Sequence, residues 1–125
     1  MKDIIATEKA PAAIGPYSQG IRTGSLLFVS GQLPIDPATG TMADTVAAQT
    51  AQSLTNLKSI LEAAGSSMAR VVKTTVFLTD MASFSAMNEV YGAFFSEGTY
   101  PARSAVEVSA LPKGALVEIE AVAEV

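Results

Sequence analysis

The chain of 125 residues contains no cysteine and no histidine. Without cysteine it can form no disulfide, offer no thiol nucleophile and build no sulfur metal site. Without histidine it lacks the Ser-His-Asp triad and the commonest metal ligand and general base. We therefore expect no metal centre, and any acid–base chemistry has to come from carboxylates, tyrosine, lysine or the backbone.

Charged residues are also scarce. They make up 16% of the chain, the net charge is −4, and the three arginines (Arg22, Arg70 and Arg103) are far apart in sequence. Phosphate binding depends on clustered lysine and arginine, so the sequence disfavours nucleic-acid binding. So few charges on so small a protein also suggest that some apolar surface is hidden in an oligomer.

Long apolar runs are absent. No run reaches the roughly 18 residues that a membrane span needs, and residues 1–3 do not begin a signal peptide. We therefore expect a cytoplasmic protein without a membrane segment. The length fits a single domain over residues 1–125 that buries about two-thirds of its unfolded surface.

Apolar spacing predicts two helices. Over residues 45–64 apolar side chains recur at steps of three and four, with Asp44 or Thr45 as the cap and Gly65 at the end. A second helix starts after Ser83, the expected cap, and carries the stripe of Phe84, Met87, Tyr91 and either Phe94 or Phe95.

Strands are predicted at residues 4–7, 18–23, 26–30 and 71–78, with a turn at residues 24–25 and a loop over 31–40. The resulting order, β-β-loop-α-β-α-β-β, predicts an α+β protein whose two helices lie on one face of the sheet. No helix remains to cover the other face, which we expect to pack on another subunit.

The last quarter of the chain, residues 101–125, is predicted to form a hairpin with its turn at 109–114. Antiparallel register then places Ala105 opposite Glu118 and Arg103 opposite Glu120. Arg103 would share one sheet face with Glu107, Glu118 and Glu120, which a slip of one residue would undo.

Each charged residue of this group also has an ordinary structural interpretation. Arg103 could form only a surface ion pair with Glu120, which contributes little energy. Glu118 and Glu120 could be solvated carboxylates, although like charges two residues apart raise the pKa of one of them. In a chain without histidine, a glutamate is the natural proton carrier.

The candidate pocket residues are open to similar alternatives. Tyr17 could be a half-buried ring with its hydroxyl in water, and Asn88 an exposed residue in the second helix. Ser30 and Gly31 could be only a strand end, where glycine permits a close backbone approach.

Several motifs follow one another along the chain. They are residues 12–20 (AAIGPYSQG), 29–32 (VSGQ), 72–77 (VKTTVF), 101–108 (PARSAVEV), 111–113 (LPK) and 117–121 (VEIEA), with Asn88, Tyr91, Phe94 and Phe95 among them. An ordered set is far more specific than one short pattern. On these motifs the chain closely resembles the Rid (YjgF) family of imine deaminases, nearly from end to end.

The resemblance implies a chorismate-mutase-like fold, a mixed sheet with two helices on one face. It implies a homotrimer with three active sites at subunit interfaces. It also implies hydrolysis, without a cofactor, of the 2-imino acids that pyridoxal-phosphate-dependent dehydratases release, giving 2-keto acids and ammonia.

By the same resemblance, Arg103 holds the substrate carboxylate, and Glu118 with the backbone carbonyl of Ala105 positions the attacking water. Tyr17, Ser30, Gly31 and Asn88 line the pocket. Many relatives have cysteine where this chain has Ala105, so no thiol-based role carries over, whereas the carbonyl role does.

Three other functions stay open at this level. A non-enzymatic receptor for small keto acids would use the same arginine, and only turnover separates it from an enzyme. RNA cleavage with translation inhibition, attributed to relatives, is disfavoured by the negative charge and the missing histidine. A chaperone-like holdase has no signature in the sequence.

Overall fold

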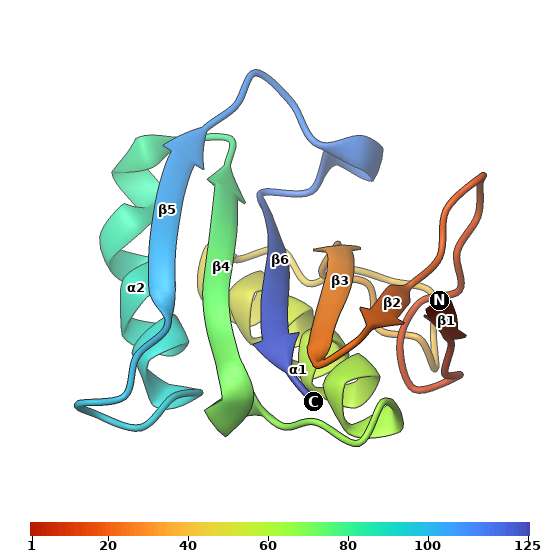
Figure 1. The fold of residues 1–125 in the computed structure, drawn as a ribbon. Helices are drawn as coiled ribbons and strands as arrows, with labels where there is room; N and C mark the ends of the chain where they lie inside the picture. The colour runs from red at the N-terminus through yellow and green to blue at the C-terminus, as the bar shows by residue number, and fades with distance from the viewer.

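In the computed structural model, which describes residues 1–125, a six-stranded sheet carries both long helices on a single face (Figure 1). The elements are β1 (Lys2–Ile5), β2 (Gly20–Thr23), β3 (Leu26–Gln32), α1 (Val46–Ala63), β4 (Val71–Leu78), α2 (Phe84–Ala93), β5 (Ala102–Glu107) and β6 (Val117–Glu124). Short 3-10 helices η1 (Met68–Arg70), η2 (Met81–Ser83) and η3 (Pro112–Gly114) lie in the connections. The predicted α+β class and the placement of both helices are confirmed. Neither helix has the length and apolar character that crossing a membrane requires.

Helix α1 begins and ends almost where the sequence predicts. The Thr45 side chain accepts a hydrogen bond from the Ala48 N–H at 3.2 Å, which satisfies one of the free donors of the first turn. Gly65 follows the last turn with a φ of 80°, a left-handed conformation that costs glycine little. Leu54 and Leu57 are fully buried, as the apolar stripe predicted.

The start of α2 differs from the prediction. Ser83 occupies the cap position, but its side chain makes no capping hydrogen bond. Instead, two acidic side chains accept hydrogen bonds from backbone N–H groups one turn earlier, in η2. Asp80 accepts from the Ala82 N–H at 2.9 Å, and Glu107 accepts from the Met81 N–H at 2.7 Å. Glu107 therefore has a structural role, tying β5 to the entrance of α2.

The strand order is β1-β2-β3-β6-β4-β5. Strand β4 is central, as predicted, and pairs antiparallel with β6 and parallel with β5. The predicted terminal hairpin is therefore wrong, because β4 lies between its two strands. Parallel pairing needs a long crossover, which α2 supplies between β4 and β5. The chain then passes over the end of β4 to reach β6 (Figure 1).

The observed register also separates the charges that the hairpin would have grouped. Arg103 lies beside Thr74 of β4, and Thr74 lies beside Ala121 of β6. The prediction placed Glu120 in that row, one residue away from the observed register. Side chains alternate between faces, so this single residue moves Glu118 and Glu120 to the face opposite Arg103.

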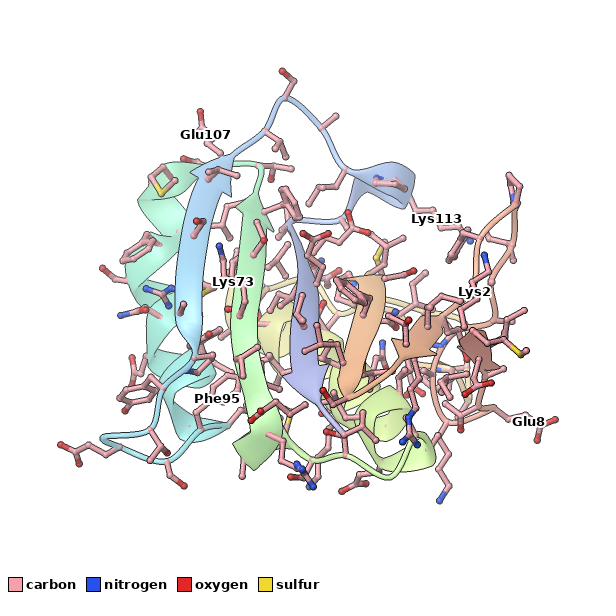
Figure 2. All side chains as sticks on the ribbon, viewed as in Figure 1. Lys2, Glu8, Lys73, Phe95, Glu107 and Lys113 are labelled. Carbon is pink, nitrogen blue, oxygen red and sulfur yellow. The ribbon has the colours of Figure 1, made fainter.

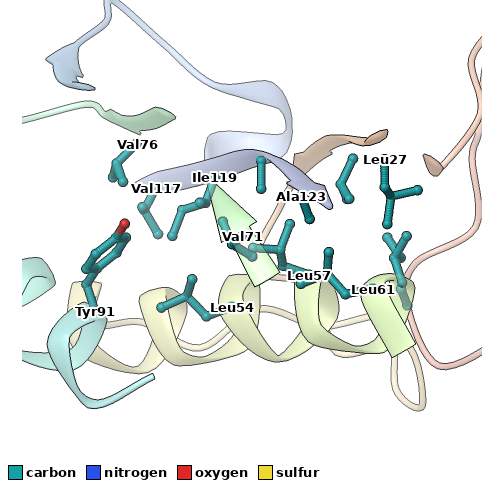
Figure 3. Close-up of a cluster of buried hydrophobic side chains, with 14 of the residues drawn as sticks. Leu27, Leu54, Leu57, Leu61, Val71, Val76, Tyr91, Val117, Ile119 and Ala123 are labelled. Carbon is teal, nitrogen blue, oxygen red and sulfur yellow. The ribbon is translucent and has the colours of Figure 1, made fainter. Parts of the chain in front are cut away.

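The hydrophobic core fills the space between the sheet and the helices (Figure 3). Leu57 and Leu61 of α1 face Ile119 of β6 and Leu27 of β3, and all four side chains are fully buried. At roughly 1.5–3 kcal/mol for each fully buried side chain of this kind, such contacts supply much of the force that holds α1 on the sheet.

The opposite face of the sheet has no cover within the chain. Three apolar side chains of β3 and β5 point to this face and remain partly exposed: Phe28 is 45% exposed, Val106 40% and Leu26 38%. Lys73 of β4 lies among them, together with Glu118 and Glu120. This half-apolar surface matches the uncovered face that the sequence predicted.

Buried amide side chains fix the loop that follows β3. Asn56 of α1 is fully buried, and its Nδ2 donates to the carbonyl of Leu33 at 3.0 Å and to that of Ile35 at 2.9 Å. Its Oδ1 accepts from Gln52 at 2.8 Å. Every polar atom of this amide side chain is thus used, so burial carries no unpaired-group penalty.

We expect Asn56→Ala to lower the free energy of unfolding by about 2–4 kcal/mol, because it leaves two carbonyls without their donor. Chemical denaturation followed by circular dichroism measures the change. Thr55→Ala, at the exposed neighbouring position, should stay within about 0.5 kcal/mol of the unsubstituted protein. Equal effects of the two substitutions would contradict this role for Asn56.

Candidate active site

Arg103 reaches from the edge strand β5 toward α2. Its Nη1 donates to the Asn88 Oδ1 at 2.7 Å, its one hydrogen bond within the chain. The guanidinium carbon lies 4.7 Å from the centre of the Tyr91 ring and 5.5 Å from that of Phe84. A guanidinium has five N–H donors in a fixed plane, so most of them remain open to a ligand.

The side chain of Arg103 lines a hollow between α2 and the edge of the sheet. The hollow, which we call the arginine hollow, is lined by Asn88, Tyr91, Gly92, Tyr100, Pro101 and Arg103. Asn88 follows the buried Met87 by one position and therefore lies at the rim of the helix, where its amide meets Arg103. Arg103 and Asn88, two residues expected in the substrate site, thus lie together.

Glu118 lies near the start of β6 and faces away from the helices. Its carboxylate packs on the backbone of Gly31, where the pairing of β3 with β6 is irregular. A Cβ atom on Gly31 would lie 2.8 Å from the Glu118 Oε2, closer than such atoms normally approach. Glycine at this position therefore leaves the space that the carboxylate occupies.

A second hollow surrounds this carboxylate. The glutamate hollow, as we call it, is lined by Pro11, Ile14, Tyr17, Gly31, Gln32, Leu33, Pro112, Lys113 and Glu118. The predicted residues Tyr17, Gly31 and Glu118 are thus brought together. Lys113 was not predicted; it has a φ of 59°, unusual for a residue with a side chain, and lies on the connection that leads into β6 (Figure 2).

The electrostatic environment of Glu118 favours its protonated form. Burial raises the pKa of its carboxyl above the ordinary value of 4.5, and the negative charge of Glu120 raises that pKa further. The sequence predicted the effect of the neighbouring charge; the larger effect, burial, follows from the fold. A carboxyl with a raised pKa exchanges protons more readily near neutral pH, as a general base and acid must.

The loop that carries Tyr17 is held by Gln19, a residue that was not predicted to have a role in the site. Gln19 is only 5% exposed, and its amide nitrogen donates to the carbonyl of Pro11 at 2.7 Å and more weakly to that of Ala10. Its Oε1 accepts from the Thr7 N–H at 2.7 Å. Tyr17 itself stays 51% exposed, as a rim residue. A glutamine inside a stretch rich in proline and glycine was the available signal.

Ser30 has a tethering role rather than a place in the glutamate hollow. Its Oγ donates to the carbonyl of Ser18 at 2.6 Å, and its N–H donates to that of Gln19 at 2.9 Å. It lines a separate hollow on the uncovered sheet face with Lys73 and Glu120. Ser30 thus fixes the Tyr17 loop against β3.

The carbonyl of Ala105 points to the open edge of the sheet. The N–H of Val108 donates to the carbonyl of Leu78 on β4 at 2.8 Å. Backbone groups of neighbouring residues point to opposite sides of a strand, so Val106, two residues before Val108, also faces β4, whereas Ala105 faces away from it. No strand of the chain lies on that side of β5, because β5 is the sheet edge.

The predicted site residues therefore form two separate halves. Arg103 and Asn88 lie on the helix side of the sheet edge, and Glu118 lies with Gly31 and Tyr17 on the other side. Strand β4 separates β5 from β6, which places the two backbones roughly 10 Å apart.

The predicted partnership of Glu120 with Arg103 is wrong for the same reason. Glu120 lies on the uncovered face beside Thr75, whereas Arg103 is held by Asn88 and Tyr91 on the helix side. No group of three or more histidine, cysteine, aspartate or glutamate side chains gathers in a way that could hold a metal ion.

The fold places the protein in a family of known proteins. The features that do so are the mixed sheet with this strand order, the two helices on one face and the arginine on the edge strand. The family model described as Endoribonuclease L-PSP matches residues 7–125. The chain belongs to this family, which is also known as the Rid (YjgF) family.

Individual relatives are similar over nearly their whole length. The 2-iminobutanoate/2-iminopropanoate deaminase of Salmonella typhimurium is 55% identical over 125 residues, covering 98% of each protein. Two Escherichia coli crystal structures share the fold with a TM-score of 0.95 and cover 98% of both chains. They are the YjgF gene product, 53% identical, and TdcF with bound serine, 50% identical.

We expect Glu120→Gln to lower the pKa of Glu118, because it removes a negative charge while the burial of Glu118 remains. Carbon-detected NMR titration of the glutamate carboxyls measures this pKa. Glu124→Gln removes the same charge further along β6 and should leave the pKa of Glu118 unchanged. An unchanged pKa in Glu120→Gln would contradict the assigned cause.

Linkage gives the sign of the related stability effect. A raised pKa in the folded state means that Glu118 contributes stability fully below its unfolded pKa and loses that contribution as the pH rises through its folded pKa. In denaturation measurements, Glu118→Gln should therefore become more stable relative to the unsubstituted protein as the pH rises above 4.5.

Proposed function

We propose that this chain hydrolyses 2-imino acids to 2-keto acids and ammonia, the activity named for its Salmonella typhimurium relative. The observation that carries the proposal is the state of Arg103. Its guanidinium is held on one side by Asn88 and stacked on Tyr91, and its other donors open into the arginine hollow. Such a fork suits the carboxylate of a small acid, which it can bind through two parallel hydrogen bonds.

Glu118 is suited to the proton transfers of the reaction. The oxygen of a water molecule bonds to the carbon of the protonated imine, the C=N π electrons move to nitrogen, and Glu118 takes one proton from that water, which leaves a neutral carbinolamine. In the resulting carbinolamine, Glu118 returns its proton to nitrogen, the C–N bond breaks and ammonia leaves with the electron pair. The hydroxyl proton is released as the keto group forms. The raised pKa of Glu118 matches a group that accepts and returns one proton.

The backbone carbonyl of Ala105 is the second group proposed to position the water. It points out of the sheet edge and has no partner strand there. A carbonyl oxygen accepts a hydrogen bond from water whatever side chain the residue carries, so alanine serves as well as any other residue.

We infer that the working site is assembled from two copies of the chain. Arg103 and Glu118 of one copy lie on opposite faces with a strand between them, so they cannot both touch one small substrate. The arginine hollow of one copy and the glutamate hollow of the next can enclose it together. The half-apolar uncovered face, with Phe28 exposed, supports such packing. A closed ring of three copies, a homotrimer, would form three equivalent sites.

The serine-bound structure of TdcF supports a site of this size and chemistry. Serine is bound to that protein, which is 50% identical to this chain. Like a 2-imino acid, serine carries a carboxylate and a nitrogen on the neighbouring carbon. The family description also names an endoribonuclease. We do not extend that activity to this chain, because its arginines lie on β2, η1 and β5 and form no cationic cluster.

We expect Arg103→Ala to lower kcat/KM for 2-iminobutanoate by about 100-fold or more, because it removes two charge-assisted hydrogen bonds of about 1.5–3 kcal/mol each. The assay generates the imine with a dehydratase and follows keto-acid release. Arg70→Ala, an exposed arginine on η1, is the matched control. If Arg103→Ala matched the unsubstituted protein, the anchor would be wrong. Binding of 2-oxobutanoate without imine turnover would instead favour a keto-acid receptor.

Mixing two inactive variants tests the shared site. Arg103→Ala and Glu118→Gln should each be nearly inactive alone. After unfolding and refolding as an equal mixture, roughly a quarter of the sites would combine an intact Arg103 with an intact Glu118 from different copies. We therefore expect about a quarter of the original activity. A site built within one chain would show no recovery at any mixing ratio.

A further inference from the structure

A closed set of contacts surrounds the Arg103 side chain. On the backbone, Arg103 lies beside Thr74 of the neighbouring strand. The Thr74 Oγ1 is 2.7 Å from the hydroxyl of Tyr91, and the Tyr91 ring lies under the guanidinium at 4.7 Å. These contacts therefore connect β4 to α2, and α2 to the arginine of β5.

Tyr91 is the rigid member of this set. It is only 4% exposed, although it carries a hydroxyl, and Thr74 is fully buried. The ring also packs on Phe95, whose ring centre lies 4.8 Å away (Figure 2 labels Phe95). Burial raises the pKa of the Tyr91 hydroxyl above 10.0, so the ring stays neutral at physiological pH. A buried tyrosine whose hydroxyl is hydrogen-bonded to Thr74 has little freedom to turn.

The arginine itself has no comparable restraint. A single hydrogen bond to Asn88 would let the guanidinium plane rotate about the Nη1 contact, and binding a carboxylate through two donors requires that plane to point in one direction. Stacking on an aromatic face fixes the plane, while Asn88 fixes which edge is occupied. Together they leave the opposite edge of the fork toward the arginine hollow.

We propose that Tyr91, held by the hydroxyl of Thr74, is a positioning residue that sets the plane of the Arg103 guanidinium for the substrate carboxylate. This role rests on the proposed function, since it acts through the carboxylate anchor. It assigns to Tyr91 a part in recognising the substrate, with Phe84 as a weaker second contact at 5.5 Å. Tyr91 also lines the arginine hollow, but the proposed role acts through its contact with the arginine.

An NMR measurement tests the geometry without any activity. The chain has only three arginines, so three Nε–Hε resonances are expected, and Arg103→Ala identifies one of them. In the unsubstituted protein this signal should be displaced by the Tyr91 ring current. Tyr91→Leu should move it to the position of a free arginine, whereas Tyr91→Phe keeps the aromatic face and should preserve most of the displacement. Phe95→Leu, which alters the packing of the same ring, is the matched control.

Kinetics test the consequence for the substrate. We expect Tyr91→Leu to raise KM for 2-iminobutanoate about tenfold with a smaller change in kcat, because it weakens substrate binding rather than the chemical step. Tyr91→Phe should restore KM to within about threefold. In the Arg103→Ala background, Tyr91→Leu should add no further loss, since the group that it positions is gone. Circular dichroism and the measured oligomer mass confirm that each variant is folded.

The possible outcomes separate the two proposals. An additive loss in the double variant, or equal effects of Tyr91→Leu and Phe95→Leu on KM, would overturn positioning in favour of general packing. An unshifted Arg103 signal in the unsubstituted protein would overturn the stacked geometry. If the unsubstituted protein hydrolyses no imine while the Arg103 signal behaves as described, the proposed function fails and the stack stands. The effect of Tyr91→Leu is then measured on the affinity of the protein for 2-oxobutanoate.

Discussion

The parallel pairing of β5 with β4 is the constraint on which the arrangement of this protein depends. It requires α2 as a crossover, so the helix lies against the strand that carries Arg103. It also makes β5 the edge of the sheet and turns the Ala105 carbonyl outward. Finally, it places β4 between Arg103 and Glu118, so that each half of the site faces its own surroundings. Antiparallel pairing of the last two strands would have left no strand between Arg103 and Glu118.

Both halves are held by polar groups that the fold buries and satisfies. Gln19 closes the Tyr17 loop, and Asn56 anchors the loop after β3 through two carbonyls. Tyr91 and Thr74 share a buried hydrogen bond beside the arginine. Buried polar groups with complete sets of partners rigidify a structure because every alternative position leaves one of them unpaired. Glu118 differs from these groups: its ionised form is disfavoured where it lies, which suits proton transfer and reduces stability.

Local features could be predicted from the sequence because they depend on neighbours along the chain. The helix after Thr45 and its end before Gly65 follow from apolar spacing and caps, and β4 follows from its β-branched residues. The alternation of Arg103 and Ala105 on one face of β5 was also correct, since it needs only the period of a strand. Residue roles came from the family resemblance alone, and the contact between Arg103 and Asn88 came from the fold.

The sequence by itself therefore determined the elements, the family and the candidate residues, including the central place of β4 and the uncovered sheet face. Only the tertiary structure decided which strands pair, and with that which charges meet. The physical reason is that strand pairing depends on contacts between distant segments, and a shift of one residue exchanges the two faces. Local periodicity contains no information on that shift. The separation of Arg103 from Glu118, and the contact of Arg103 with Tyr91, both follow from it.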